Sequence, residues 1–313
     1  MKKILFTEFG PPTVLNLTEQ KFPEISGNQI LVKNKAAALN PIDYKIRNGS
    51  NYMAQRLKDC LPCGLGYDFS GEVVAMGEAV ENFKLGDAVF GLVPQEKPGA
   101  YADYLVTTAD LIVQKPEAIS FISAACLPTA GLTAIQALEL IELQPKQRIL
   151  IHAGAGGVGH MAIQLAKLKG AYVITTASAR NHEFLYALGA DQCIDYHAQN
   201  FVELLTEKVD AVLDLVGFET GIASLSVLKA DGKMVTVPSI TAEKIVKAGQ
   251  ERNFQLQGMH KKFSENQLNY LAGLVADKKL KIEIEHRFAL SEAVAAHTLL
   301  ESGRVRGKLV FQI

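Results

Sequence analysis

A turn with four glycines in six residues, Gly154-Ala-Gly-Gly-Val-Gly159, constrains the fold of this chain more than any other feature. An apolar segment, residues 148–152, precedes the turn, and a segment with its apolar residues on one helical face, residues 158–169, follows it. The spacing G-x-G-x-x-G between a strand and a helix is typical of a site for the diphosphate of a dinucleotide. The glycines permit a tight turn, a close approach of phosphate and close packing of helix on strand, while the helix start supplies partial positive charge. A turn that only reverses the chain is the alternative interpretation.

Strands and helices alternate through the middle of the chain, which is the pattern of βαβ units around a parallel sheet. Helical periodicity begins in residues 123–140 and returns in 158–169 and 181–188. The expected strands are residues 148–152, 171–176, 192–195, 209–216, 233–237 and 254–257. Six strands are as many as a complete dinucleotide-binding sheet uses, so the sequence predicts an α/β fold with a doubly wound parallel sheet.

The first hundred residues have a different sequence pattern, in which Gly and Pro separate short strand-like segments. This pattern predicts a compact β-barrel-type domain. The segments are residues 3–6, 29–38, 71–76, 88–91 and 102–107. After Gly258 two helices, 265–276 and 291–302, lead to a closing strand, 308–313. This tail is too short for a third domain, so we expect it to complete the first one.

The length of 313 residues favours two domains, because a single core rarely grows that large. We place one domain at residues 1–120 and 256–313 and the other at residues 121–255.

The charge of the chain is balanced, with 32 Lys and Arg against 33 Asp and Glu, which argues against nucleic acid or an anionic membrane as a partner. No stretch reaches the roughly 18 apolar residues of a membrane helix, and the first ten residues lack the pattern of a signal peptide. Four cysteines in so long a chain do not form a disulfide framework, so we expect a cytoplasmic protein. Cys60 and Cys63 form a C-x-x-C without a second pair nearby, which favours two ordinary thiols over half of a zinc site.

The segment after the second strand of the glycine-turn domain indicates which nucleotide binds. An NAD site usually presents Asp or Glu about 20 residues past the turn, yet no acidic residue occurs between Gly159 and His182. Ser178 and Arg180 instead offer a hydroxyl and a guanidinium, which suit the 2′-phosphate of NADPH. Alternatively, Arg180 caps a surface loop and NAD is tolerated.

Five motifs in order resemble the medium-chain dehydrogenase/reductase superfamily, specifically its zinc-independent quinone oxidoreductase and alkenal/enone reductase branch. They lie at residues 38–45, 66–73, 84–89, 127–134 and 154–159. The resemblance spans nearly the whole chain and implies a GroES-like β-barrel-type catalytic domain and a Rossmann NADPH-binding domain.

The same resemblance implies a site without metal. Where zinc alcohol dehydrogenases of the superfamily carry their catalytic zinc ligands, this chain has Asn40, Tyr67-Asp68 and Thr129. None of these supplies the thiolate or imidazole that zinc prefers. Asp68 is expected to be structural.

The resemblance also implies which residues form the site. Asn40 and Lys45 are the catalytic candidates. The cofactor-binding candidates are Lys45, Thr129, Gly154, Gly156, Gly157, Val158, Gly159, Ser178, Arg180, Tyr196, Val216, Gly217, Val237, Ser239 and Lys308. From the residues alone, the segment beginning at Asn40 equally fits a plain turn in which Asp43 bonds nearby backbone. His152 is expected to be a packed residue and no general base.

The predicted activity is an NADPH-dependent, zinc-free transfer of hydride to a small electrophile, a quinone or an α,β-unsaturated carbonyl. Lys45 stands where better known quinone reductases carry Tyr, which shifts the expected substrate toward enones. The alternatives are an enoyl-thioester reductase or alcohol dehydrogenase-like enzyme, and a non-catalytic NADPH-binding redox sensor. By resemblance we expect a homodimer formed through residues 254–258.

Overall fold

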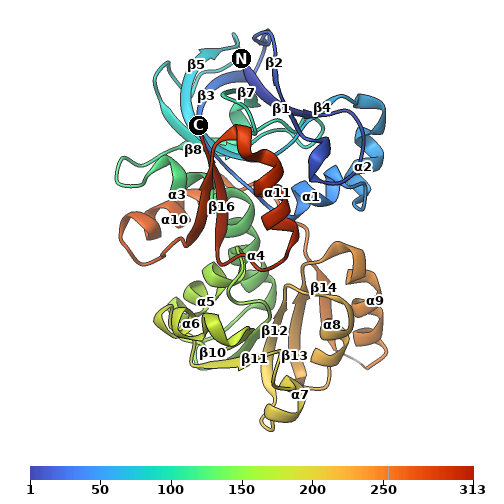
Figure 1. Cartoon of the computed structure of the whole chain (residues 1–313). Coiled ribbons are helices and arrows are strands. Elements are labelled where there is room, and N and C mark those ends of the chain that lie inside the picture. Colours follow the sequence, from blue (N-terminus) through green and yellow to red (C-terminus); the bar gives the residue numbers. More distant parts are fainter. Residues whose placement is uncertain (253) are drawn as a thin grey trace. The chain divides into compact units, whose positions relative to one another are not determined.

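The computed structural model describes residues 1–252 and 254–313, which form two compact units (Figure 1). Unit 1 comprises Met1–Ala130, Phe263–Lys278 and Ile282–Ile313, and unit 2 comprises Gly131–Lys262 and Lys279–Lys281. Among the described residues, no helix has both the length and the apolar character that crossing a membrane requires.

Unit 1 is built mainly from antiparallel strands. Its strands are β1 (Lys2–Phe6), β2 (Asn16–Glu19), β3 (Gln29–Ala38), β4 (Cys63–Gly64), β5 (Asp68–Met76), β6 (Ala88–Leu92), β7 (Tyr104–Thr108), β8 (Ile112–Gln114), β15 (Ile284–Phe288) and β16 (Lys308–Gln312). Its helices are α1 (Pro41–Arg47), α2 (Tyr52–Leu57), α3 (Phe121–Ala125), α10 (Glu265–Ala276) and α11 (Ala293–Glu301).

The long strand β3 organises unit 1. One sheet has the order β15-β16-β3-β5-β6-β8, with β7 also paired to β3, and a second has the order β2-β1-β4. Residues of β3 alternate between the core and solvent, with Ile30 and Val32 fully buried and Lys33 exposed, as expected for a sheet with one face on a core. The tail strand β16 pairs with β3, so the tail completes the first unit as the sequence predicts.

Unit 2 is a single parallel sheet with helices on both sides. Its strands are β9 (Arg148–Ile151), β10 (Tyr172–Ala177), β11 (Gln192–Asp195), β12 (Val209–Asp214), β13 (Leu228–Thr236) and β14 (Gln255–Gly258). Its helices are α4 (Leu132–Ile141), α5 (Gly159–Leu168), α6 (His182–Ala187), α7 (Phe201–Leu204), α8 (Phe218–Ser224) and α9 (Ser239–Gln250).

The strand order of unit 2 is β11-β10-β9-β12-β13-β14, which is the doubly wound order of a Rossmann fold. All six predicted strands are present. Figure 1 shows α5 and α6 on one side of this sheet and α8 and α9 on the other. The chain order reverses beside β9, and this switch point is where such sheets bind ligands, outside the carboxyl ends of the strands.

One predicted helix, 123–140, is interrupted in the structure. Helix α3 ends at Ala125, residues Leu127–Gly131 form a wide π-type turn, and α4 starts at Leu132. Pro128 lies in this turn and has no N–H to donate, which disfavours a regular helix there. Such widened turns often mark functional positions.

The boundaries of the units differ from the predicted domain boundaries. The structure divides the chain at Ala130 and Lys262, whereas the sequence placed the divisions at 120 and 255. The second difference has a simple cause, because β14 pairs with β13 and therefore belongs to the sheet of unit 2.

Candidate active site and cofactor-binding residues

The glycine turn follows β9 and leads into α5, as predicted, and Gly154, Gly156 and Gly159 lie in different environments. A Cβ on Gly154 would lie 1.9 Å from Oγ1 of Thr175, and one on Gly159 would lie 2.4 Å from the carbonyl oxygen of Ala153. These two glycines therefore let the turn pack on β10 and on itself. A Cβ on Gly156 would meet only the Ala153 carbonyl oxygen, at 3.4 Å, so the space beside Gly156 is open.

The other unit 2 candidates all lie just beyond the carboxyl ends of parallel strands. They follow β9 (Gly157, Val158), β10 (Ser178, Arg180), β11 (Tyr196), β12 (Val216, Gly217) and β13 (Val237, Ser239). Because parallel strands end at a common edge of the sheet, the fold brings these segments together along that edge. The sheet thus brings these candidates to the edge where a dinucleotide binds in folds of this type.

Asp214 supports part of this edge of the unit 2 sheet through hydrogen bonds, and the sequence analysis did not identify it. It is fully buried at the end of β12 and accepts hydrogen bonds from the backbone N–H groups of Val216 and Gly217, at 3.0 and 2.8 Å. Oγ1 of Thr236 also donates to it, at 2.8 Å. A carboxylate held by several donors makes a rigid support, so Asp214 fixes the loop that carries two cofactor candidates.

His152 is a packed residue in the structure. Its Nδ1 lies 3.0 Å from Oγ1 of Thr176 and its Nε2 lies 2.9 Å from Oγ of Ser224. Burial lowers the pKa of His152 to about 4, so the imidazole is neutral at pH 7. Both ring nitrogens are occupied, which leaves no free base.

Four polar residues form a cluster in unit 1, in which Asn40, Asp68 and Lys308 are buried and Thr129 is partly buried. Asp68 accepts hydrogen bonds from Nδ2 of Asn40 at 2.9 Å, from Oγ1 of Thr129 at 2.5 Å and from N–H of Thr129 at 3.2 Å. Nζ of Lys308 donates to Oδ1 of Asn40 at 2.5 Å and to the Leu39 carbonyl at 2.7 Å. The structure therefore brings three predicted site residues, Asn40, Thr129 and Lys308, onto one carboxylate-centred network.

Strand pairing explains how these distant residues meet. In the sheet of unit 1, Ala38 lies opposite Asp68 on one side and opposite Val310 on the other. Asn40 follows β3 directly, Asp68 starts β5, and Lys308 starts β16, so the three strand ends converge. Thr129 joins from the π-type turn, whose irregular backbone points its N–H toward Asp68.

The network extends inward to Asp43, in the first turn of α1. Oδ2 of Asp43 accepts from the backbone N–H of Asn40 and from the hydroxyl of Tyr101, both at 2.7 Å. The backbone hydrogen bond is the one that a plain turn at Asn40 predicts, so the turn and the buried network coexist. Burial raises the pKa of Asp43 to about 7, against the opposing effect of the Tyr101 hydrogen bond.

Lys45 lies apart from this network. It is on α1, is half-buried, and makes no hydrogen bond to the cluster among the described residues. Burial lowers the pKa of its ammonium group from the ordinary value. The amine is therefore better suited to give up a proton than an exposed lysine.

The chemistry of the cluster is that of amide, hydroxyl, carboxylate and ammonium groups. Within the described part of the chain, no three His, Cys, Asp or Glu residues gather as metal ligands would. One N–H of Asn40 is weakly used, since its contact with the Ala38 carbonyl is 3.5 Å long. The arrangement offers hydrogen-bond donors for a developing negative charge on oxygen.

A glycine-turn Rossmann unit combined with a barrel-type unit that carries buried polar residues defines the class of two-domain, nucleotide-dependent oxidoreductases. Family models agree: residues 26–117 match the alcohol dehydrogenase GroES-like domain, and residues 188–311 match a model described as zinc-binding dehydrogenase.

Three relatives narrow the assignment. The chain is 54% identical to the quinone oxidoreductase of Coxiella burnetii, with a TM-score of 0.99 over 100% of this chain and 99% of that one. It is 31% identical to Escherichia coli quinone oxidoreductase complexed with NADPH, with a TM-score of 0.91 over 100% of both chains. It is also 39% identical to the chloroplastic NADPH-dependent alkenal/one oxidoreductase of Arabidopsis thaliana, over 76% of this chain and 62% of that protein. The chain belongs to the quinone oxidoreductase family of the medium-chain dehydrogenase/reductase superfamily.

Proposed function

We propose that this protein is a zinc-independent reductase that uses NADPH to reduce quinones or α,β-unsaturated carbonyl compounds. The observation that carries the proposal is the open space beside Gly156 at the switch point of a Rossmann sheet. The names of the relatives supply the substrate classes, quinone and alkenal or enone.

The residues fit NADPH on physical grounds. A diphosphate needs an approach free of side chains at a helix start, which Gly156 and α5 provide. The segment after β10 carries Ser178 and Arg180, with no carboxylate before Glu183, and the Arg180 guanidinium suits a 2′-phosphate. We assign the adenosine phosphate to Ser178, Arg180 and Tyr196.

The remaining candidates are assigned to the other parts of the cofactor. The glycine turn, from Gly154 to Gly159, takes the diphosphate. The nicotinamide half and its ribose are assigned to Lys45, Thr129, Val216, Gly217, Val237, Ser239 and Lys308. When bound, NADPH supplies the hydride, so the protein has mainly to orient and to stabilise charge.

Asn40 and Lys45 are the proposed catalytic residues. Reduction of a quinone or enone places negative charge on the carbonyl oxygen. The weakly used N–H of Asn40 is available to donate to that oxygen, while Asp68 and Lys308 hold the amide in a fixed orientation. Lys45, with its lowered pKa, supplies a proton.

The absence of zinc from the reaction is proposed from the residues at the ligand positions. Asn40 and Thr129 each donate a hydrogen bond to Asp68, and the three residues offer oxygen and amide groups where a catalytic zinc needs thiolate or imidazole. Unchanged turnover after dialysis against a chelator is the expected result, and turnover that depends on added zinc would contradict it.

The activity is tested by NADPH oxidation with a panel of quinones, alkenals and enoyl thioesters. We expect the unaltered protein to turn over quinones or alkenals. We expect the kcat of Lys45→Ala at saturating NADPH to fall by about tenfold or more, because the variant lacks the proton donor. Lys35→Ala, which removes a surface lysine of the same unit, is the matched control. Unchanged kcat in Lys45→Ala removes Lys45 from the mechanism, and preference for enoyl thioesters identifies the enzyme as an enoyl reductase. NADPH binding without its oxidation by any electrophile would indicate that the protein is a non-catalytic NADPH-binding redox sensor.

The cofactor preference is tested by titration with NADPH and NADH. We expect Arg180→Ala to weaken NADPH binding by about tenfold or more, since a charge-assisted contact with phosphate is worth about 1.5–3 kcal/mol. NADH is the internal control, and its affinity should stay the same because it has no 2′-phosphate. Equal affinity of the unaltered protein for NADH and NADPH is the contrary result.

We also propose that the protein is a homodimer joined through β14. This strand is at one edge of the unit 2 sheet, with Gln255 and Gln257 exposed. An unpaired edge can add a strand from a second copy. Two copies related by a twofold axis would join their sheets into one.

Finally, we propose a cytoplasmic location. All four cysteines, Cys60, Cys63, Cys126 and Cys193, are free thiols, as is usual in a reducing compartment. Cell fractionation with an antibody to the protein tests this, and recovery from an oxidising compartment or an organelle would contradict it.

A further inference from the structure

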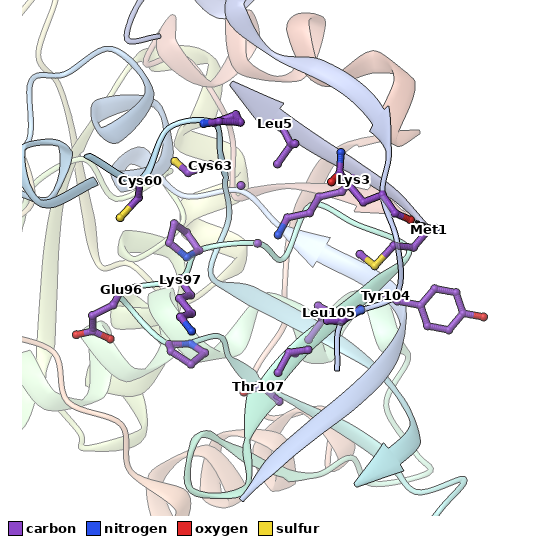
Figure 2. Close-up of a pocket in the computed structure, with 18 of the residues that line it drawn as sticks. Met1, Lys3, Leu5, Cys60, Cys63, Glu96, Lys97, Tyr104, Leu105 and Thr107 are labelled. Carbon is purple, nitrogen blue, oxygen red and sulfur yellow. Dashed lines mark hydrogen bonds between the residues drawn. The ribbon is translucent and has the colours of Figure 1, made fainter. Parts of the chain in front are cut away.

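Unit 1 contains a cavity that lies apart from the residues of the proposed active site. Its volume is about 600 Å³, which is in the range of small-molecule sites. Residues of β1, β4, β7 and the loop from Pro94 to Gly99 line it (Figure 2). Asn40, Lys45, Asp68, Thr129 and Lys308 are not among its lining residues.

The side chain of Lys3 extends from β1 toward the interior of the cavity, with its amine at the tip (Figure 2). Among the residues that the structure describes, none forms a hydrogen bond or an ion pair with this amine. Burial lowers the pKa of Lys3 from the ordinary value and outweighs the opposing effect of Cys63. A partly buried cation without a counter-ion is costly, and an anion bound beside it would offset that cost.

Two glycines make room for the end of the Lys3 side chain. A Cβ on Gly64 would lie 2.6 Å from Cε of Lys3, and a Cβ on Gly99 would lie 2.8 Å from its Nζ. The amine is thus held against bare backbone on two sides, which limits its motion and directs it into the cavity.

The rest of the lining indicates the chemistry of a ligand. Most of the exposed lining is apolar, from leucine, proline and valine side chains. Among the charged side chains of the wall, Lys21 and Lys97 add to the charge of Lys3, and Glu96 opposes it. An apolar body with one negative group fits this combination better than a neutral or a cationic molecule.

The two cysteines of the cavity do not suggest a competing role. Cys60 is exposed and Cys63 is buried, and burial raises the pKa of the Cys63 thiol to about 11. A thiol with so high a pKa stays protonated at pH 7 and is a poor nucleophile and a poor metal ligand.

We propose that this cavity is a second binding site, for a small organic carboxylate with an apolar body, whose carboxylate pairs with the Lys3 amine between Gly64 and Gly99. The proposal does not depend on the assigned activity, because the cavity shares no residue with the proposed active site.

The test uses 4-phenylbutyrate and its neutral analogue 4-phenylbutanamide as probes, with the full chain, in calorimetric titrations. NADP⁺ is present throughout, so that the proposed cofactor site is occupied. We expect the carboxylate to bind the unaltered protein, and the amide to bind about tenfold more weakly or worse, because only the carboxylate pairs with the amine.

In Lys3→Met, which keeps the length of the side chain, the carboxylate should lose about tenfold in affinity. Lys33→Met, which removes an exposed lysine of β3 outside the cavity, should bind as the unaltered protein does.

A second variant distinguishes a loss of binding from a folding defect in Lys3→Met. In Gly99→Ala the added methyl group meets mainly the flexible end of Lys3, since the nearest backbone atom is 4.0 Å away. We expect this variant to melt within about 2 °C of the unaltered protein and to bind the carboxylate less tightly. No binding of the carboxylate at millimolar concentration, or equal binding by Lys3→Met, would overturn the proposal.

Discussion

Asp43 illustrates how burial changes the chemistry of a single residue. Its carboxyl group is fully buried, and two donors share one of its oxygens. Burial raises its pKa from 3.8 to about 7. The folded protein therefore holds this proton more tightly than the unfolded chain does. The resulting stabilisation is fully present below about pH 4 and is lost as the pH rises through 7.

This linkage predicts the behaviour of Asp43→Asn, whose side chain does not ionise. Relative to the unaltered protein, the variant should gain unfolding free energy as the pH rises from 4 to 7.5, by on the order of 2–4 kcal/mol. Urea unfolding at several pH values measures the difference. His152 and His297 have lowered pKa values, so they change the unfolding free energy with pH in the opposite direction. Both residues are present in the variant and in the unaltered protein, so their contributions cancel in the comparison. The exposed Asp59→Asn is the control, and a difference for Asp43→Asn that does not change with pH would refute the assignment.

At the scale of elements, the strand–turn–helix unit from β9 to α5 separates two roles of glycine. Gly154 is needed by the fold, because its Cα faces Oγ1 of Thr175 on the neighbouring strand. Gly156 is not needed by the fold, because the space beside it is open. Under the proposed function, that space is where diphosphate approaches.

These roles predict opposite results for two otherwise identical substitutions. Gly154→Ala should lose about 2 kcal/mol or more of unfolding free energy, because a methyl group cannot fit 1.9 Å from an oxygen atom. Gly156→Ala should fold with a change below about 1 kcal/mol and yet bind NADPH about tenfold more weakly or worse. Denaturant unfolding and NADPH titration of both variants provide the measurement, and each variant controls for the other. Full NADPH affinity in Gly156→Ala would remove the diphosphate from this turn.

At the scale of the whole molecule, β11 and β14 are the two edge strands of the unit 2 sheet within residues 1–252 and 254–313. The proposed dimer uses β14, so the assembly should have twice the chain mass of 34.0 kDa. Light scattering after size-exclusion chromatography measures it. Gln257→Lys should shift the mass toward that of one chain, because like charges would meet across the twofold axis. Gln192→Lys, on the other edge strand, should leave the mass unchanged, and a monomer in the unaltered protein would refute the dimer.

The sequence determined the order and type of most elements, because their signals are local. Hydrophobic periodicity located all six strands of unit 2, and the glycine spacing located the turn and the start of α5 to within a residue. It missed the break in the helix at Leu127–Gly131, where Pro128 and the contact of Thr129 with Asp68 override helical periodicity. The sequence by itself also predicts a phosphate-binding segment after β10, because that prediction depends only on which residues follow the strand.

Only the tertiary structure decided which polar residues act together. The ammonium of Lys308 reaches Asn40 across 268 positions of the chain, and Asp68 gathers Asn40 and Thr129. Likewise, the pKa of Asp43 and the isolation of the Lys3 amine depend on burial by distant strands. The physical reason is that hydrogen bonding and desolvation depend on distances in space. Those distances are set by strand pairing and packing, which no local pattern of residues records.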